Sequence, residues 1–368
     1  MDLLDQSAPI KIKDLRARIV NVPLRRPLIA RVTRVDFATL LLIDVETEAG
    51  HTGHAYIHAF PAASAVAFRE LVRAFAEIAI GHTLAPAVLH DTLTKRIGIF
   101  IGIEGPFISA LASLDMACWD ALAKANGQPL ARLLGGTVER LKTYNSTGLG
   151  LATEAHLKNE ALQLLERGFT GLKMRLGNET LAEDIGRVRA IRSVISDDIS
   201  LMSDCGQSMT TVEAIRRGRA LDDEGLYWIE DPVVYHDLAG HGRIAAEIET
   251  PVQTGENLFG PQRFADALAQ RPADYMNLDL QHIGGITGWM RAARMAATAN
   301  MPLSSHIYPE FSAHALAATP TAHWLEYFDW ADAILAEPLR VEAGMALVTK
   351  QPGAGIEWNE AAVARHLA

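Results

Sequence analysis

Three acidic residues recur at an even interval in the second half of the chain, and each follows a short apolar run of the kind that forms a strand. They are Asp204, Glu230 and Glu256, spaced 26 residues apart. Three carboxylates that converge on one point cannot all stay ionised without a cation. Oxygen donors alone, with no His or Cys at the same interval, suit Mg²⁺ better than Zn²⁺. The sequence therefore predicts a magnesium site formed by these three residues.

Basic side chains occupy similar strand-end positions. Lys173 and Arg175 are two residues apart, so both project to the same face of a strand. His306 ends the strand after the one that ends in Asp279, an arrangement in which a carboxylate orients the imidazole and raises its basicity. Such a pair alone is more often structural than catalytic, but its place in a ring of polar strand ends favours a role in proton transfer.

These groups suit the removal of a proton next to a carboxylate. The anion formed in that step is unstable in water, so an enzyme must place positive charge and hydrogen-bond donors on the carboxylate oxygens. Mg²⁺ and Lys173 would supply the charge. We expect Glu326, in its acid form with a raised pKa, to donate a hydrogen bond to the other oxygen. The predicted activity is abstraction of the α-proton of a 2-hydroxycarboxylate.

Repeated strand and helix signals position these residues. Helix starts are indicated at Thr153, Thr211, Pro261 and Gly285. Eight such units predict a closed parallel barrel in the α/β class, whose strands end at one mouth. The candidate strands are residues 141–147, 171–175, 200–204, 226–230, 252–256, 275–279, 302–306 and 322–326.

The first part of the chain reads as a separate α+β lid domain. Strands are expected at 19–24, 40–46 and 53–56, and helices at 62–80 and 108–126. We expect the capping domain to span residues 1–138 and the barrel residues 139–343. The last segment, 344–368, forms no further unit and is expected to return to the cap.

Charge and composition limit the partners. A net charge of −10 disfavours nucleic acid and membrane surfaces, and the Arg216, Arg217 and Arg219 cluster is expected to be a solvated helix face. Cys118 and Cys205 are expected to be reduced thiols. The N-terminus has no secretion signal and no apolar run reaches about 18 residues, so we expect a cytoplasmic protein.

Several motifs resemble the enolase superfamily, and within it the mandelate racemase group, along nearly the whole chain. They are Asn21-Val-Pro-Leu, Asp115-Met-Ala-Cys-Trp-Asp, Trp228-Ile-Glu-Asp-Pro, Gly255-Glu-Asn, Ile283-Gly-Gly-Ile-Thr-Gly-Trp, Ser304-Ser-His and Ala318-Thr-Pro-Thr-Ala-His-Trp-Leu-Glu. The last three are the most specific. The resemblance implies a modified TIM barrel of the (β/α)7β type with an α+β N-terminal capping domain, and a homo-oligomer.

The same resemblance implies roles for individual residues. Asp204, Glu230 and Glu256 match the magnesium ligands of the family. His306 with Asp279 matches one acid/base, and Glu326 matches the electrophilic acid. Ser146 and Lys173 match positions that contact the substrate carboxylate.

Two departures bear on the reaction. Arg175 stands where mandelate racemase has the second lysine of a Lys-x-Lys motif, and Gly206 stands where it has an asparagine. Arginine keeps its proton, with a pKa above about 12, so it is a poor base. We therefore favour dehydration of an acid sugar or related hydroxy acid, which needs one base and one acid.

Two alternatives remain. One is a racemase or epimerase of a 2-hydroxy acid in which Arg175 acts as an unusual base. The other is a catalytically silent binding protein that keeps the metal site, although such a protein has no need for the complete set of catalytic residues.

An arginine-rich loop follows Pro23. By resemblance it is a flap over the substrate, so Arg31 and Arg34 are candidate contacts to a second anionic or polyhydroxyl end, with Tyr56 as a further contact. A solvated loop is an equally good interpretation of the same charges.

Overall fold

The computed structural model describes residues 9–31, 33–137 and 140–368. The expected domain boundary between residues 138 and 139 lies outside the described residues. So does the N-terminal stretch, residues 1–8, in which no secretion signal was found. Among the described residues, no helix is long and apolar enough to cross a membrane.

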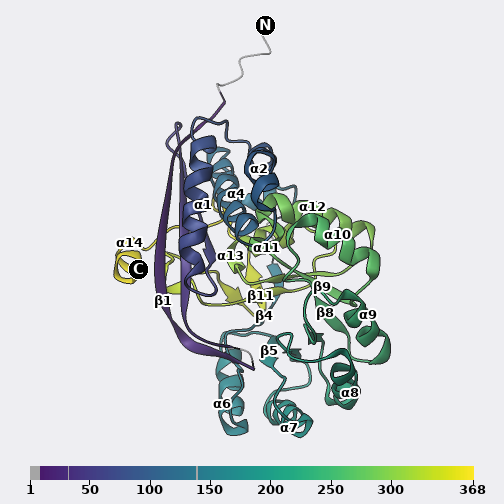
Figure 1. Ribbon diagram of the computed structural model, residues 1–368. Coiled ribbons are helices and arrows are strands. Elements are labelled where there is room, and N and C mark those ends of the chain that lie inside the picture. The colour runs from purple at the N-terminus through teal and green to yellow at the C-terminus, as the bar shows by residue number, and fades with distance from the viewer. Residues whose placement is uncertain (1–8, 32, 138–139) are drawn as a thin grey trace.

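The N-terminal part is an antiparallel three-stranded sheet with helices packed on one face (Figure 1). The strands run in the order β1-β2-β3, and β1 and β2 are far longer than predicted because they continue as a hairpin beyond the sheet. Helix α4 lies close against β3 at Gly53, where a Cβ atom would come within 2.0 Å of the Ala117 carbonyl oxygen. The elements are β1 (Ile12–Ala30), β2 (Thr33–Thr47), β3 (Thr52–His58), α1 (Ser64–Ala79), α2 (Pro86–Leu93), a π-helix (Thr94–Gly98), α3 (Ile99–Ile101), α4 (Pro106–Ala125) and α5 (Leu130–Leu133).

Eight parallel strands in the described part of the chain form the barrel. Neighbouring strands pair from β4 through to β10, and β11 pairs with β4. The circle closes where the Ser305 amide, in β10, donates to the Trp324 carbonyl oxygen next to β11 at 3.0 Å. The strands are β4 (Arg140–Asn145), β5 (Gly171–Arg175), β6 (Ser200–Asp204), β7 (Ile229–Glu230), β8 (Val252–Thr254), β9 (Tyr275–Asp279), β10 (Leu303–His306) and β11 (Leu325–Tyr327).

Helices follow the first seven of these strands, which confirms the (β/α)7β barrel with its N-terminal cap for the described residues. Thr153 caps α6 as predicted, but Thr210, and not Thr211, caps α8, because the Thr210 side chain accepts from the Glu213 amide. The helices are α6 (Glu154–Leu165), α7 (Leu181–Arg192), α8 (Thr211–Leu221), α9 (Leu238–Glu247), α10 (Gly260–Gln270), α11 (Leu280–Ile283), α12 (Gly285–Thr298) and α13 (Pro309–Ala317).

The strands β7, β8 and β11 differ from their predicted ranges. β7 and β8 are shorter than expected, and β11 begins and ends later. The apolar runs there include residues that pack in loops next to the barrel, so hydrophobicity alone overestimated the paired region.

The C-terminal segment contacts both the barrel and the cap. β13 (Met345–Leu347) pairs antiparallel with β4, and β12 (Val341–Glu342) pairs antiparallel with β13. The last helix, α14 (Glu360–His366), lies beside β1 (Figure 1), where Arg18 Nη1 is 2.6 Å from Glu360 Oε2.

The cap and the barrel share one hydrophobic core, which contains residues from both parts. Asp115 on α4 accepts hydrogen bonds from the Thr287 amide and hydroxyl at 2.9 and 2.6 Å. At the far end of the β1–β2 hairpin, the Leu151 amide donates to the Ile29 carbonyl oxygen at 2.8 Å. The hairpin therefore reaches the mouth of the barrel from outside.

Candidate active site

Strand register brings the predicted acidic residues together. Arg175 is paired with Asp204 across β5 and β6, and Asp204 with Glu230 across β6 and β7. Glu256 lies in a turn just beyond β8, and not in the strand as predicted. The turn needs Gly255, which has a φ of 136° and where a Cβ atom would meet the Asn277 carbonyl oxygen at 2.5 Å.

Two basic side chains lie between these carboxylates. Lys173 Nζ is 2.6 Å from both Glu230 Oε1 and Glu326 Oε1, and 3.7 Å from Asp204 Oδ2. Arg175 forms an ion pair with Asp204 through Nη1 and Oδ2. Within the described residues, no three acidic, histidine or cysteine side chains already surround one point as metal ligands do. The basic side chains hold the carboxylates apart.

The charge balance nevertheless fits a divalent cation. Asp204 and Glu256 both line the central cavity and offer the hard oxygen donors that Mg²⁺ prefers. Burial raises the pKa of Glu230, and Glu256 and Glu326 add to that rise against the opposing effect of Lys173. Burial also raises the pKa of Asp231 well above its ordinary value, and Glu256 raises it further. The site thus carries more carboxyl groups than its own cations neutralise.

His306 and Asp279 form the predicted pair. His306 Nδ1 lies 2.7 Å from Asp279 Oδ2, and the His282 amide donates to the other oxygen of Asp279 at 2.9 Å. The carboxylate accepts the Nδ1 proton, which leaves Nε2 free to face the site, 3.4 Å from Glu256 Oε2. Burial lowers the pKa of His306, but Glu256 and Asp279 outweigh it and bring the value to about 10.

Glu326 differs from the prediction. Burial alone would raise its pKa, but Lys173 and His306 lower it to about 2. This direction is opposite to the raised pKa that we expected, because Lys173 Nζ lies 2.6 Å from Oε1. Glu326 Oε2 instead accepts from the Ile307 amide at 2.9 Å, which places the carboxylate under the turn that follows His306.

That turn is strained. Ile307 and Tyr308 have φ values of 39° and 50°, a region that costs a non-glycine residue about 1–3 kcal/mol. Glu326 holds the Ile307 amide, and the Ser312 hydroxyl donates to the Ile307 carbonyl oxygen at 2.8 Å. His306 and Tyr308, on either side of Ile307, line the same cavity. No sequence pattern indicated this turn.

The mouth of the barrel contains a cavity of about 380 Å³, within the range of about 300–1,000 Å³ common for small-molecule sites. The barrel contributes charged and polar residues, and the cap closes the other side. The residues that line the cavity include Leu28, Val35, His58, Phe60, Arg175, Asp204, Gly206, Glu256, Asp279, Gln281, His306, Tyr308, Phe328 and Trp330. Ser146 is fully buried behind them, where it accepts from Arg175 Nη2 at 3.4 Å.

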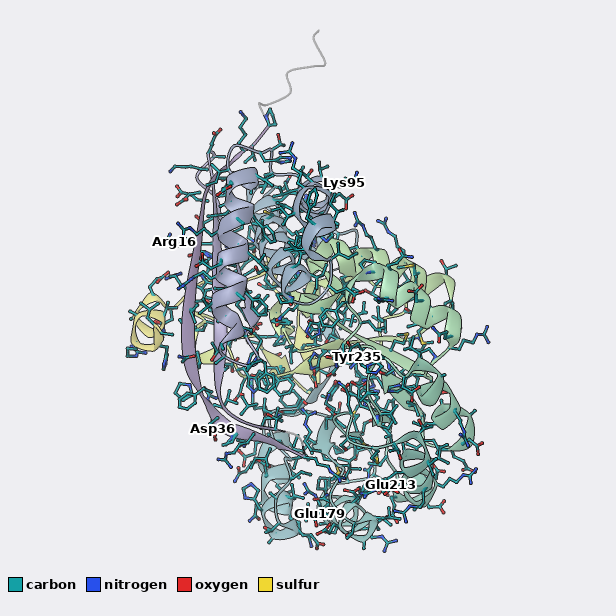
Figure 2. The ribbon with its side chains drawn as sticks, in the orientation of Figure 1. Arg16, Asp36, Lys95, Glu179, Glu213 and Tyr235 are labelled. Atoms are coloured by element: carbon teal, nitrogen blue, oxygen red, sulfur yellow. The ribbon has the colours of Figure 1, made fainter. Side chains whose placement is uncertain are left out.

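The proposed flap contacts lie elsewhere. Arg31 donates to the Gly177 carbonyl oxygen at 3.1 Å, and Arg34 pairs with Asp36 at 2.8 Å on the outer side of the hairpin (Figure 2). Neither lines the cavity. Tyr56 also lies outside it and donates to Glu310 Oε2 at 2.6 Å. The hairpin residues that line the cavity are Leu28, Ala30, Thr33 and Val35.

Several lining residues were not predicted. His58 ends a cap strand, and Trp330 lies in the segment after β11. Gln281 follows Asp279 by two residues, so its place just after a polar strand end was a usable signal. His58 and Trp330 gave no such signal, because their approach depends on how the cap packs on the barrel.

Two family descriptions match the chain. "Enolase C-terminal domain-like" covers residues 156–362, and "Mandelate racemase / muconate lactonizing enzyme, N-terminal domain" covers residues 13–135.

The chain is also similar to individual proteins of known name. L-Talarate/galactarate dehydratase of Salmonella typhimurium is 33% identical over 72% of this chain and 67% of its own length. The 3,6-anhydro-alpha-L-galactonate cycloisomerase of Streptomyces coelicolor is 34% identical over 70% of this chain and 72% of its own length. A crystal structure of an enolase from Bradyrhizobium, complexed with magnesium and mandelic acid, superimposes with a TM-score of 0.94 at 39% identity, over 99% of this chain and 100% of the other.

These relatives are lyases and isomerases built on one fold. The match covers both the cap and the barrel, and the motifs that suggested it lie along the same residues. The chain therefore belongs to the mandelate racemase/muconate lactonizing enzyme family of the enolase superfamily, and it is an enzyme of the lyase or isomerase type.

Proposed function

We propose that this enzyme abstracts the α-proton of a 2-hydroxycarboxylate and then eliminates a hydroxyl group, so that a hydroxy acid of the acid-sugar type becomes a 2-keto acid. The observation that carries the proposal is the unequal chemistry of two basic side chains that line the cavity. One is a histidine paired with a carboxylate, and the other is an arginine engaged by Asp204. One proton acceptor is enough for dehydration, whereas racemisation through two bases needs a second.

Asp204, Glu230 and Glu256 are the proposed ligands of Mg²⁺. They supply oxygen donors from neighbouring strand ends, and the excess of buried carboxyl groups favours a divalent cation. When bound, the ion would supply positive charge to the substrate carboxylate. The magnesium in the Bradyrhizobium structure supports the choice of metal.

His306 is the proposed base, with its Nδ1 held by Asp279. Glu256 is the main group that raises the His306 pKa, so a cation held by Glu256 would offset that effect and allow Nε2 to accept a proton. Lys173 would neutralise a carboxylate oxygen of the substrate, with Ser146 behind it. After taking the α-proton from C2, His306 can return it to the hydroxyl on C3, so that the C3–O bond breaks, water leaves and an enol with a C2–C3 double bond remains. The enol oxygen then loses its proton and C3 gains one, which gives the 2-keto acid. The substrate loses one molecule of water in total.

Substitution of the base tests the proposal. His306→Asn keeps a polar side chain but removes the acceptor of suitable basicity, and we expect kcat to fall about 100- to 10,000-fold. The assay combines a panel of acid sugars and 2-hydroxy acids with Mg²⁺, detection of 2-keto acids and NMR detection of α-hydrogen exchange in deuterium oxide. His156→Asn is the control, because the His156 side chain is 62% exposed on α6.

The product decides between the reactions. Keto acid that forms with the wild type and is lost with His306→Asn supports dehydration. Rapid α-hydrogen exchange with formation of the opposite stereoisomer and no keto acid would overturn it in favour of a racemase or epimerase. Activity that survives complete removal of divalent metal by EDTA would refute the metal site.

A further inference from the structure

A single buried side chain joins the two turns that follow the proposed proton-transfer pair. Gln281 lies two residues after Asp279 and is 6% exposed, and Tyr308 lies two residues after His306 and is 2% exposed. The Tyr308 hydroxyl donates to Gln281 Oε1. Asp279 and His306 are therefore connected twice, once by their own hydrogen bond and once through the residues that follow them.

The cap is bonded to the same side-chain amide. The His58 backbone amide donates to Gln281 Oε1 at 3.1 Å and to the Tyr308 hydroxyl at 3.0 Å. Gln281 Nε2 donates to the Ser109 hydroxyl at 3.2 Å. His58 ends strand β3 and Ser109 lies in helix α4, so the sheet and a helix of the cap both bond to the Gln281 side chain.

The orientation of the Gln281 amide follows from its neighbours. A backbone N–H can only donate, so the end of the side chain that faces the His58 amide is the oxygen. Tyr308 must then donate to that oxygen, and it keeps its proton because burial and Asp279 raise its pKa well above the ordinary value. The nitrogen faces Ser109, whose hydroxyl can accept. Glutamine thus serves two donors and one acceptor without adding a charge.

The turn that Gln281 holds carries strain. Ile307 and Tyr308 have φ values of 39° and 50°, a conformation that persists only when surrounding contacts impose it. Two contacts to the barrel fix the backbone of Ile307, and Gln281 fixes the side chain of Tyr308. We expect that loss of the Gln281 contact lets the turn relax and that the His306 ring, one residue earlier, moves with it. A displacement of about 1 Å at a reacting group can lower a rate about 100-fold.

We propose that Gln281 is a positioning residue that holds the turn after His306 to the turn after Asp279 and to the cap, and thereby orients the His306 imidazole for proton abstraction. Gln281 acts through Tyr308 and not by contact with the reacting atoms. The orientation of the base then depends on the cap, so proton abstraction is efficient only when the cap is packed on the barrel. The proposal rests on the proposed function for the role of His306 as the base.

Kinetics separate positioning from substrate contact, which matters because Gln281 also lines the cavity. Gln281→Met removes both hydrogen-bonding ends at a similar length, and Tyr308→Phe removes only the hydroxyl. We expect each to lower kcat for loss of the α-proton about 10- to 100-fold and to leave KM within about threefold, measured by keto-acid formation and by exchange in deuterium oxide. Gln281→Glu, which keeps an acceptor for Tyr308, should recover part of kcat. A loss confined to KM would assign Gln281 to substrate binding and would overturn the proposal.

The two residues should act as one unit. The double variant Gln281→Met/Tyr308→Phe should lose no more than about threefold in kcat beyond the weaker single variant, because both changes remove the same hydrogen bond. Losses that multiply would show that the two side chains have independent roles, which contradicts positioning through Tyr308.

The link to the cap is tested with two serines on α4. Ser109→Ala removes the acceptor for Gln281 Nε2, and we expect kcat to fall about three- to tenfold. Ser113→Ala is the matched control, because Ser113 is also buried but donates to the Ala110 carbonyl oxygen at 2.7 Å within the same helix. Its kcat should stay within about twofold of the wild type. Equal losses in the two variants would refute the dependence on the cap.

Hydrogen exchange and crystallography provide readouts that do not depend on turnover. In Gln281→Met, the His58 amide should exchange at least about tenfold faster than in the wild type, whereas the Ala59 amide, which is bonded within the cap, should change by less than about twofold. A crystal structure of the variant should show the turn at 307–308 displaced together with the His306 ring, and an unchanged turn would overturn the proposal. If the wild type takes the α-proton from no acid, the proposed function fails, and these two measurements alone decide whether Gln281 positions the turn.

Discussion

At the scale of single residues, Arg175 determines which proton transfers are available. Its guanidinium pairs with Asp204 through Nη1 and donates to the Ser146 hydroxyl through Nη2. Both contacts use donors that an arginine never gives up, so the side chain binds and orients but does not accept a proton. Arg175 therefore cannot serve as the second base that racemisation through two bases would need.

Arg175→Lys should introduce a second base at this position. A lysine ammonium has an ordinary pKa of about 10.4, well below that of an arginine, so a lysine at this position can give up its proton and act as a base, as an arginine cannot. We expect the variant to catalyse α-hydrogen exchange with inversion in a 2-hydroxy acid, while kcat for keto-acid formation falls. NMR in deuterium oxide with each stereoisomer separately measures both.

The matched control for this change is Arg187→Lys. Arg187 is also largely buried, but it donates to the Gly150 carbonyl oxygen and to Asn178, outside the cavity. Inversion by the control variant, or no exchange of either stereoisomer by Arg175→Lys, would contradict the assignment of position 175 as the missing second base.

At the scale of elements, an arginine expected to be solvated joins two helices. Arg217 on α8 is 4% exposed, and its Nη1 pairs with Asp184 on α7. It also donates to the Asn178 and Glu179 carbonyl oxygens at 2.9 and 3.0 Å. The interpretation of the arginine cluster as a solvated face was wrong at this position, because the loop before α7 folds over α8.

Arg217→Ala should therefore lower the free energy of unfolding. It leaves the Asp184 carboxylate buried without its cation, and breaking such a pair costs about 3–5 kcal/mol of unfolding free energy. Arg216→Ala is the matched control, since the Arg216 side chain is 64% exposed and bonds the same Glu213, and the change should cost less than about 0.5 kcal/mol. Urea denaturation measures both, and similar losses in the two variants would disprove the anchoring role.

At the scale of the whole molecule, buried polar pairs fix the cap on the barrel. Tyr56 of the cap donates to Glu310 of α13, and Asp115 of the cap accepts from Thr287 of α12. Burial raises the pKa of Glu310 to about 7, and burial also raises that of Asp115 to about 7 against the hydrogen bonds from Thr287. The junction on which the cavity depends is therefore sensitive to pH.

The direction in which stability changes with pH follows from how many protons the folded and unfolded states bind. The pKa of Glu310 is about 7 in the folded protein and near 4.5 in the unfolded chain, so between these values the folded state holds more protons. The free energy of unfolding then falls as pH rises, by about 3 kcal/mol once the pH is above 7. Glu310→Gln keeps an acceptor for Tyr56 and removes this loss.

We expect Glu310→Gln to equal the wild type in urea denaturation at pH 5 and to exceed it at pH 8. Glu166→Gln, at an exposed position after α6, should keep the wild-type difference between the two pH values. A variant with the same pH dependence as the wild type would show that Glu310 is ionised without cost in the folded protein.

The sequence by itself determined the family, the barrel and most of the residues at its mouth. Parallel strands end at one mouth, so polar residues repeated once per unit had to converge there, as Asp204, Glu230 and His306 do. Local capping signals also placed the starts of α6, α8, α10 and α12 to within one residue. These features depend on the spacing of residues along the chain, which can be read directly from the sequence.

Only the tertiary structure decided how the site is closed and charged. His58 and Trp330 meet through packing of cap on barrel, and the positive φ angles of Ile307 and Tyr308 depend on contacts to Glu326 and Ser312. The direction of the Glu326 pKa depends on distances to Lys173 and His306 that no spacing along the chain specifies. Electrostatic and steric effects act through space, so their outcome was fixed only when the cap and the barrel came together.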